Sequence, residues 1–529
     1  MPCIWGILDF RSIGVKPTKQ PEEQEAVSMK FRIVLTTVLW TLMAGSSWCQ
    51  DAPVSEATQE CLDCHTIFHP GIVEGWRSGR HAAVTPRQAM AVEGSARKVS
   101  SAVVPESLST SVVGCAECHT LRPSAHADTF EHNGYNIHVV VSPEDCRTCH
   151  AQEAEQYSGN IMAHAYSNLA DNAIYHQLQR VILGTPSLVD GKVEIAAENA
   201  DTQADACYYC HGTVLKVTET EVRDTDVGEL EFPVIAGWPN QGVGRINLDG
   251  SKGACTACHP RHTFSMAMAR QPHTCRECHI GPDVPAYKVY LSSKHGNIYS
   301  SSHQTWDFNN TPWRIGQDFT APTCAVCHIS LVADTEGEIV NERSHEMKNR
   351  LSWRIFGLIY AHPQPKSPDV TVIRNKDDQP LPTDFNGGLA GDFLLSQEQQ
   401  DKHTRTMQAT CLACHDTSWV QGHWRRYTNT IRETNASILT LTNIMSEAWT
   451  RGYARGLGQG ENPFDEVAER KWSDAWLFYG NTVRFASAMA GGGDYGVFAD
   501  GRYQLSQVIA ELHEWVEQRR ILEDQSAQP

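Results

Sequence analysis

The sequence has almost no cysteine outside one recurring pentapeptide, and this scarcity limits what the cysteines can do. Of the 18 cysteines, only Cys3 and Cys49 lie outside eight copies of Cys-x-x-Cys-His. Neither a zinc ribbon nor a disulfide framework requires a histidine directly after every second cysteine. We therefore do not interpret the cysteines as zinc ligands or as disulfides.

The sequence also lacks positive charge and, after its N-terminal region, long apolar runs. It has 44 Lys and Arg against 62 Asp and Glu, which gives a formal net charge of −18. Such a charge disfavours nucleic acid or an anionic membrane surface as a partner, and it suits a basic electron-carrier protein. No segment after residue 50 is long and apolar enough to predict a membrane span.

The pentapeptide is the attachment site of c-type haem, and its copies are numbered here motif 1 to motif 8 along the chain. Its two thiols bond the porphyrin, and its histidine binds the iron from the proximal side. Eight covalent haem c groups are therefore predicted, and electron transfer is the default hypothesis. The thioether pairs are Cys61/Cys64, Cys115/Cys118, Cys146/Cys149, Cys207/Cys210, Cys255/Cys258, Cys275/Cys278, Cys324/Cys327 and Cys411/Cys414. The proximal histidines are His65, His119, His150, His211, His259, His279, His328 and His415.

The N-terminal region predicts export. Residues 29–50 have a basic start, an apolar run over 33–43 and small residues after it, as a secretory signal peptide does. Met29 directly precedes the basic pair, so we predict that translation starts there and that 1–28 is upstream sequence. A longer start of the signal is the alternative. Because haem c is attached after export, the protein is expected in the periplasm.

The spacing of the motifs divides the rest of the chain. Seven motifs lie in a haem-rich region, 51–330, and the eighth lies in a loop-rich region, 331–420, which contains a Pro/Asp/Gly-rich loop. The region 421–529 has apolar residues at three- and four-residue spacing, which predicts helices over 424–455, 463–488 and 502–522. Alternation of apolar and polar residues within 193–234 favours a small hairpin.

Sixteen histidines lie outside the motifs, and they are the candidates for second axial ligands. An electron-transfer haem usually has a second histidine on its iron, whereas a catalytic haem leaves that position open. Eight closed haems would need eight such histidines, and one open haem would need seven. The count alone therefore leaves both an enzyme and a pure electron conduit open.

The contexts of the motifs resemble those of the octahaem hydroxylamine oxidoreductase family. The resemblance is strongest over 255–330, where spacer residues match as well as motifs: His-Pro-Arg-His-Thr-Phe-Ser after Cys258, Gly-Pro-Asp after motif 6, and Ser-Lys-His-Gly from Ser293. Trp76-Arg-Ser-Gly-Arg-His81-Ala resembles a segment that carries an early distal histidine. In total the resemblance covers about 60–480.

The resemblance implies a mainly α multihaem cytochrome c fold, with a haem-packed core and a C-terminal helical bundle, and a homotrimer. It also implies that the haem of motif 4 is a five-coordinate substrate haem and that the other seven transfer electrons. The distal ligands that it implies are His81, His138 (or His132), His164, His262, His295 and His345, with the seventh unassigned and His69 and His403 as weaker options.

The sequence departs from that family at the residues expected to act on substrate. Family members that oxidise hydroxylamine carry Asp-His after motif 6, but here Asp283 is followed by Val284. Their haem-crosslinking tyrosine corresponds to Tyr495, in a poorly matching context, and no histidine lies between His423 and His513. Asp283 is the candidate proton carrier, with a turn-capping carboxylate as the alternative. For Tyr495 the alternative is a packed loop tyrosine.

These departures favour reduction over oxidation. The predicted reaction is reduction of nitrite or hydroxylamine toward ammonium at motif 4, with electrons from a cytochrome c or a quinol-linked protein. Oxidation of hydroxylamine or hydrazine is the first alternative, and a non-catalytic electron conduit is the second.

Overall fold

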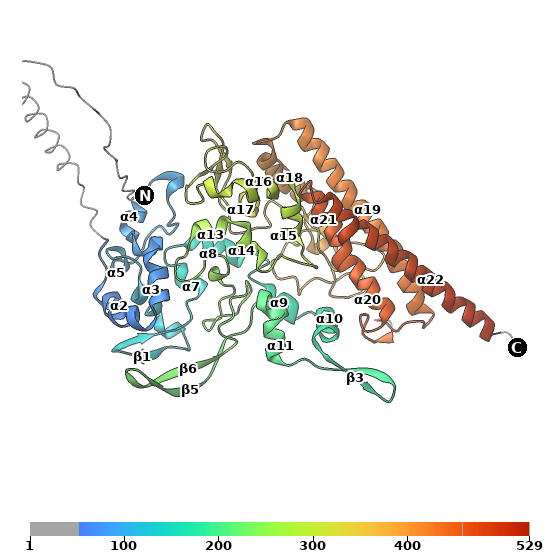
Figure 1. Cartoon of the computed structure of the whole chain (residues 1–529), viewed down its shortest axis with the longest axis horizontal. Coiled ribbons are helices and arrows are strands. Elements are labelled where there is room, and N and C mark those ends of the chain that lie inside the picture. Colours follow the sequence, from blue (N-terminus) through green and yellow to red (C-terminus); the bar gives the residue numbers. More distant parts are fainter. Residues whose placement is uncertain (1–51, 457–458, 528–529) are drawn as a thin grey trace, which may run out of the picture. The chain divides into compact units, whose positions relative to one another are not determined.

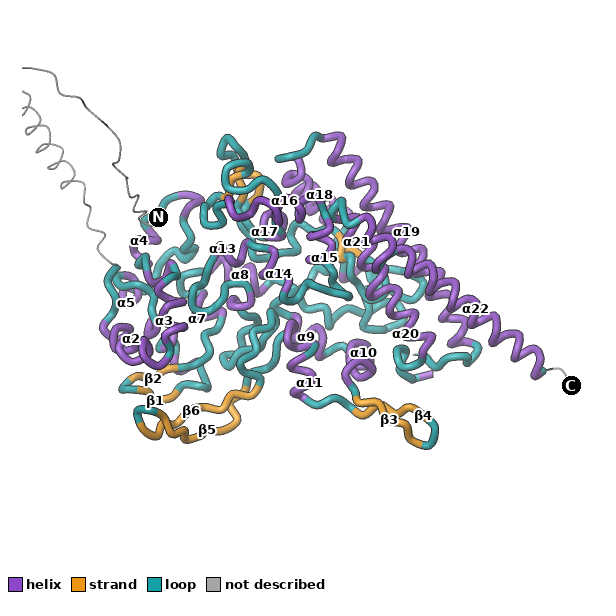
Figure 2. Tube along the Cα trace, viewed as in Figure 1, coloured by secondary structure: helices purple, strands orange, loops and turns teal. Residues whose placement is uncertain are grey.

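Helices and loops make up most of the structure, a computed structural model that describes residues 52–456 and 459–527 (Figures 1 and 2). The mainly α fold predicted from the sequence is confirmed. The predicted signal peptide and the proposed start at Met29 lie outside the described residues. No helix among the described residues is both long and apolar enough to cross a membrane.

The haem-rich region is built from many short helices joined by loops. Short helices suit this region because each haem motif needs only one helical turn, and the porphyrins supply apolar surface that long helices would otherwise provide. The helices are α2 (Glu56–Phe68), α3 (Pro70–Arg77), α4 (Pro86–Met90), α5 (Glu106–Ser109), α6 (Cys115–His119), α7 (Pro143–Cys146), α8 (Ala151–Ser158), α9 (Ala165–Ala170), α10 (Ala173–Leu183), α11 (Ala200–Asp205), α12 (Cys207–His211), α13 (Met266–Arg270), α14 (Pro272–Arg276), α15 (Ala286–Ser292), α16 (Lys294–Ser302) and α17 (Cys324–His328). The loop-rich region adds α18 (Gln397–Leu412).

The strands form small separate sheets, shown in orange in Figure 2. The hairpin expected within 193–234 is confirmed, because residues 216–225 pair with 228–236. A second hairpin pairs 185–189 with 192–196 across Asp190-Gly191, both at positive φ as a tight turn requires. The strands are β1 (Phe130–His132) with β2 (Tyr135–Ile137), β3 (Thr185–Val189) with β4 (Lys192–Ala196), β5 (Lys216–Thr225) with β6 (Gly228–Ala236), β7 (Trp313–Arg314) with β8 (Val332–Ala333) and β9 (Ile339–Asn341), and β10 (Trp353–Arg354) with β11 (His362–Pro363).

Four long or medium helices form the C-terminal region, where α19 packs against the other three (Figure 1). They are α19 (Thr417–Thr450), α20 (Val467–Asp474), α21 (Gly480–Ala488) and α22 (Arg502–Ser526). The apolar spacing predicted them, with two differences. The first begins earlier, because Asp416 caps the N-terminal amides of Ser418 and Trp419. The second is divided by a π-helical turn, Ala475–Tyr479.

A buried carboxylate lies inside this helical region. Glu469 is fully buried and accepts hydrogen bonds from Trp449 Nε1 at 2.8 Å and from the Glu466 amide at 3.1 Å. Burial raises the pKa of Glu469 to about 7, although both hydrogen bonds oppose the shift. The folded chain therefore keeps a proton that the unfolded chain releases near its ordinary value of 4.5.

This carboxylate predicts a pH-dependent stability. Because the folded-state pKa is raised, its contribution is fully present below pH 4.5 and is lost as pH rises toward about 7. We expect the melting temperature of the wild type to fall over this window, and Glu469→Gln to flatten the fall. Thermal unfolding followed by far-ultraviolet circular dichroism at several pH values measures both. An unchanged pH profile in the variant would contradict the prediction.

Candidate haem and substrate sites

The residues of the motifs fit haem attachment. In motifs 1, 2, 4 and 7 both cysteines and the histidine lie on one helix. In the other four, the amide of the histidine donates to the carbonyl of the first cysteine at 2.9–3.0 Å, which is the bond of one helical turn. No disulfide joins the 16 motif cysteines, and the described residues include no metal-ligating cluster that contains a cysteine. These sites therefore suit thioether bonds to porphyrin and not zinc.

The thiols of successive attachment sites adjoin one another. The thiols of motifs 1 and 2, 3 and 5, 4 and 6, and 6 and 7 lie close enough to shift one another's pKa: Cys61–Cys115, Cys146–Cys255, Cys210–Cys278 and Cys275–Cys324. Electrostatic interactions link motifs 2 and 3, 5 and 6, and 7 and 8: Cys118–Cys149, Cys258–Cys275 and Cys327–Cys411. The order in space is thus 1-2-3-5-6-7-8, and motif 4 branches from motif 6.

Five proximal histidines face a second histidine ring at one characteristic separation. Two imidazoles that bind one iron from opposite sides place their ring centroids about 6 Å apart, from two metal–nitrogen bonds of about 2 Å. The observed centroid distances lie between 6.1 and 6.5 Å, for His65–His132, His119–His138, His150–His81, His259–His345 and His415–His295. The structure thus brings four of the six predicted distal candidates, and the alternative His132, opposite motif histidines.

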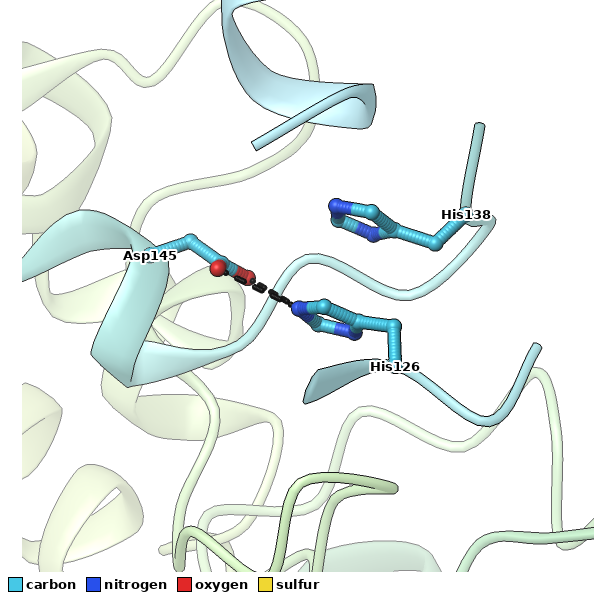
Figure 3. A group of neighbouring side chains, drawn as sticks. All are labelled: His126, His138 and Asp145. Atoms are coloured by element: carbon cyan, nitrogen blue, oxygen red, sulfur yellow. Dashed lines mark hydrogen bonds and ion pairs between the residues drawn. The ribbon is translucent and has the colours of Figure 1, made fainter. Parts of the chain in front are cut away.

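His138 has the right separation, but backbone carbonyls lie beside both of its ring nitrogens, and its ring lies against that of His126 (Figure 3). Its Nε2 lies 2.8 Å from the Leu121 carbonyl and its Nδ1 lies 3.1 Å from the Val140 carbonyl. Its ring stacks at 3.7 Å on His126, whose Nε2 pairs with Asp145 at 3.1 Å. Because a neutral imidazole carries one N–H, His138 can donate to only one of these carbonyls, and its other nitrogen keeps a lone pair. His262 interacts electrostatically with His119 and is the second candidate for motif 2.

The remaining candidates lie near motifs that have no such ring partner among the described residues. His403 Nδ1 donates to the Leu351 carbonyl at 2.9 Å, next to Arg350, whose guanidinium donates to the Cys327 carbonyl of motif 7 at 3.1 Å. His164 directly precedes Ala165 beside motif 4, and its Nδ1 is buried without a partner. His69 instead hydrogen-bonds Nδ1 of His65 at 2.8 Å.

Motif 4 is held on α12 with its histidine oriented by a backbone carbonyl. His211 Nδ1 donates to the Ala165 carbonyl at 3.2 Å, which leaves Nε2 free to bind iron. Burial lowers the pKa of His211, while the Ala165 carbonyl and Asp283 raise it and Arg354 lowers it. Asp283 and Arg354 are therefore the charged neighbours of this site.

Asp283 and Tyr495 are the two predicted catalytic residues. Asp283 is near motif 4: its charge acts on Cys207, Cys210 and His211, and its backbone carbonyl accepts from Asn481 Nδ2 at 2.8 Å. Val284 packs in a hydrophobic cluster with Phe485, so this position contributes no polar group.

Tyr495 lies in a π-helical turn, Tyr495–Ala499, within its own chain. Its hydroxyl donates to Asp500 Oδ2 at 2.9 Å, and burial together with this bond raises its pKa. The Tyr495 hydroxyl is thus hydrogen-bonded within its own chain. The crosslink stays a prediction.

Four polar residues that the fold brings to this region could not be identified from the sequence. Arg354 and His362 are cross-strand partners on β10 and β11, Tyr175 on α10 interacts electrostatically with both Arg354 and Asp283, and Arg484 on α21 is fully buried. Arg354 and His362 lie in the loop-rich region, where no periodicity marks them. Only the burial of polar residues far apart in sequence reveals the cluster.

Comparisons with known proteins agree with the haem motifs. A protein-family model described as seven times multi-haem cytochrome CxxCH matches residues 229–356, and one described as cytochrome c554 and c-prime matches residues 145–231. A solved structure described as a hypothetical multiheme protein is 36% identical with a TM-score of 0.83, and the match covers 90% of this chain and 98% of that chain.

Two proteins of Kuenenia stuttgartiensis are more distant. A reducing HAO-like protein complex is 16% identical with a TM-score of 0.60, over 90% of this chain and 87% of that chain, which is a likeness of fold. A probable nitrite reductase-hydroxylamine oxidoreductase fusion protein is 26% identical over 278 residues, or 51% of this chain. The match covers 25% of that protein, so the chain spans about a quarter of its length.

Proposed function

The chain belongs to the multihaem c-type cytochromes related to hydroxylamine oxidoreductase, and we propose that it is an octahaem reductase of nitrite or hydroxylamine. The substrate site is motif 4, and the other seven haems carry electrons to it. An iron porphyrin held by His211 would supply an open coordination position and the electrons. Reduction of nitrite to ammonium consumes six electrons and eight protons and releases two waters. Reduction of hydroxylamine consumes two electrons and three protons and releases one water.

The position of motif 4 carries this proposal. The other seven motifs adjoin in one line, whereas among the described residues motif 4 meets that line at motif 6, where Cys210 lies beside Cys278 and its Sγ donates to the Glu277 carbonyl at 3.9 Å. Histidines are available to close six irons: His132, His262 (or His138), His81, His345, His403 and His295 for motifs 1, 2, 3, 5, 7 and 8. We assign His164, which precedes Ala165 beside motif 4, to no iron, and among the described residues no second histidine ring faces His211 at the separation of the five pairs.

Reduction is favoured over oxidation by the residues around motif 4. Asp283 is present to move a proton, but Val284 packs in an apolar cluster where family members that oxidise hydroxylamine carry histidine. Tyr495 lies in a poorly matching context, and its hydroxyl donates to Asp500 within its own chain. Oxidation of hydroxylamine or hydrazine remains the alternative reaction at the same site.

A pure electron conduit is the second candidate function, because the line of seven motifs would by itself conduct. Its two ends are marked by the motif cysteines that are exposed, Cys64 in motif 1 and Cys414 in motif 8. The branch at motif 4 has no role in a conduit, which is why we favour the enzyme. We propose that a periplasmic cytochrome c or quinol-linked protein delivers electrons at one of these ends and that the protein is a homotrimer.

Carbon monoxide binding to the reduced protein tests the open site. We expect one haem of eight to shift its Soret band, because carbon monoxide binds ferrous iron only where no protein ligand closes it. Ammonium should then form from nitrite or hydroxylamine with reduced viologen as the electron donor. If carbon monoxide does not change the spectrum of the reduced protein and all haems are low-spin, the enzyme hypothesis fails and the electron conduit is the remaining function.

A further inference from the structure

The hairpin of β10 and β11 places two polar side chains next to each other inside the protein. Arg354 and His362 are paired across the strands, and His362 is 1% exposed. His362 Nδ1 donates to the Pro363 carbonyl at 2.7 Å, which fixes the tautomer and leaves the lone pair on Nε2. His362 can therefore accept a hydrogen bond or a proton at Nε2.

A buried hydrogen-bond frame ties this hairpin to the loop that carries Asp283. Asn435 binds both the amide and the carbonyl of Ala361, at 3.1 and 2.9 Å. Arg484 donates to Asn435 at 2.8 Å and to Asn481 at 3.2 Å, and Asn481 donates to the Asp283 carbonyl at 2.8 Å. The residue before His362 and the backbone of Asp283 are thus held by the same three side chains.

The positive charge in this frame has no protein counter-ion among the described residues. Arg354 and Arg484 form no ion pair, and Nε of Arg484 is buried without any partner. Burial lowers the pKa of both guanidinium groups. Burying a charge without a partner is costly, so the region is built to receive an anion. Arg354 also lowers the pKa of His211, so this unpaired positive charge lies near motif 4.

We propose that Arg354 and His362 form the substrate-binding side of motif 4, selective for a small oxyanion such as nitrite. Arg354 binds the oxyanion, because a guanidinium offers planar donors to two oxygens. His362 accepts at Nε2 the proton that accompanies the anion, and so supplies the polar group that Val284 does not. The inference rests on the proposed function and names the substrate class of that site.

Binding of the anion and uptake of the proton are coupled through charge. Burial and then Arg354 lower the pKa of His362 to about 3, the Pro363 carbonyl opposes this, and Arg484 lowers it further. These are the charged groups that face His362 from β10 and α21. An anion between the guanidinium groups offsets their charge, so His362 gains proton affinity when the anion binds.

The first test uses Arg354→Met, with Arg354→Lys as the matched variant that keeps the charge. Nitrite affinity is measured by spectral titration of the oxidised protein, and carbon monoxide affinity on the reduced protein serves as the neutral control. We expect nitrite to bind about tenfold to hundredfold more weakly to Arg354→Met, with Arg354→Lys between the two. Carbon monoxide affinity and haem content should stay at wild-type values.

The second test uses His362→Gln, which keeps size and polarity but cannot take up a proton. A pH-indicator dye in weak buffer measures net protons bound when nitrite is added. We expect uptake in the wild type, so that nitrite affinity rises as pH falls, and none in the variant. Uptake of equal size in both proteins would overturn the role of His362.

The outcomes separate this inference from the proposed function. A wild type that binds neither carbon monoxide nor nitrite defeats the proposed function itself. A wild type that binds both, with unchanged nitrite affinity in Arg354→Met, overturns the inference alone. If Arg354→Met loses haem, or loses carbon monoxide binding together with nitrite, Arg354 pairs with a porphyrin propionate instead, and the inference fails.

Discussion

Replacement of Cys207 and Cys210 by serine is expected to abolish substrate turnover while leaving most of the haem in place. Serine cannot form the thioether bonds, so the haem content should fall by one. Carbon monoxide binding should vanish, and reduction of nitrite and hydroxylamine should fall by at least about three orders of magnitude, to the uncatalysed background. Haem stoichiometry by pyridine haemochrome, mass of the intact protein and ammonium formation measure these three effects.

The matched control is Cys411→Ser/Cys414→Ser, which removes the haem at the end of the line. It should also cost one haem, but carbon monoxide binding should survive because motif 4 is intact. Turnover with a small-molecule reductant should persist in this control, since electrons can still enter near motif 1. Loss of carbon monoxide binding in the control but not in the motif 4 variant would assign the open haem to motif 8.

The attachment sites could be predicted from the sequence because haem attachment depends on local spacing. Two thiols and one histidine within a single turn need no tertiary contact to be recognised. The C-terminal helices were predictable for a related reason, since buried Ile431, Ile438, Leu441 and Met445 repeat at helical spacing. The apolar spacing does not predict the earlier start of α19, because that start depends on the capping residue Asp416, which directly follows motif 8.

The arrangement of the haems in space could not be predicted, because it depends on contacts between distant segments. The sequence identifies His81 and His345 as candidate distal ligands, but only the fold shows that they lie opposite His150 and His259. The branch at motif 4 rests on contacts with motif 6, where Cys210 lies beside Cys278 and its Sγ donates to the Glu277 carbonyl at 3.9 Å.

The polar cluster at motif 4 was missed for the same physical reason. Arg354 and His362 lie in a segment with no periodic pattern, and their burial depends on Asn435, Asn481 and Arg484 from the C-terminal helices. A sequence pattern records which face of an element is apolar, but it does not record which buried polar groups satisfy one another. The sequence therefore located Asp283 and could not supply its neighbours.

Gly212→Ala is expected to destabilise the protein and to disturb the motif 4 haem. Gly212 follows His211 directly and ends α12 at φ 93°, a conformation that L side chains rarely adopt. A Cβ at this position would also overlap the backbone of Gly244 and Arg245. Strain and overlap together should cost about 2–5 kcal/mol. Thermal unfolding, haem content and the carbon monoxide difference spectrum measure the effect.

Gly250→Ala separates the two causes, because Gly250 has a similar φ of 80° but no atom within 4 Å of an added Cβ. It should cost only the conformational strain, about 1–2 kcal/mol, and should leave carbon monoxide binding unchanged. The difference between the two variants isolates the close packing of Gly212 against the 244–245 backbone. If both variants lose the same stability and both keep the carbon monoxide spectrum, this close packing does not position His211, and the Ala165 carbonyl alone must orient its ring.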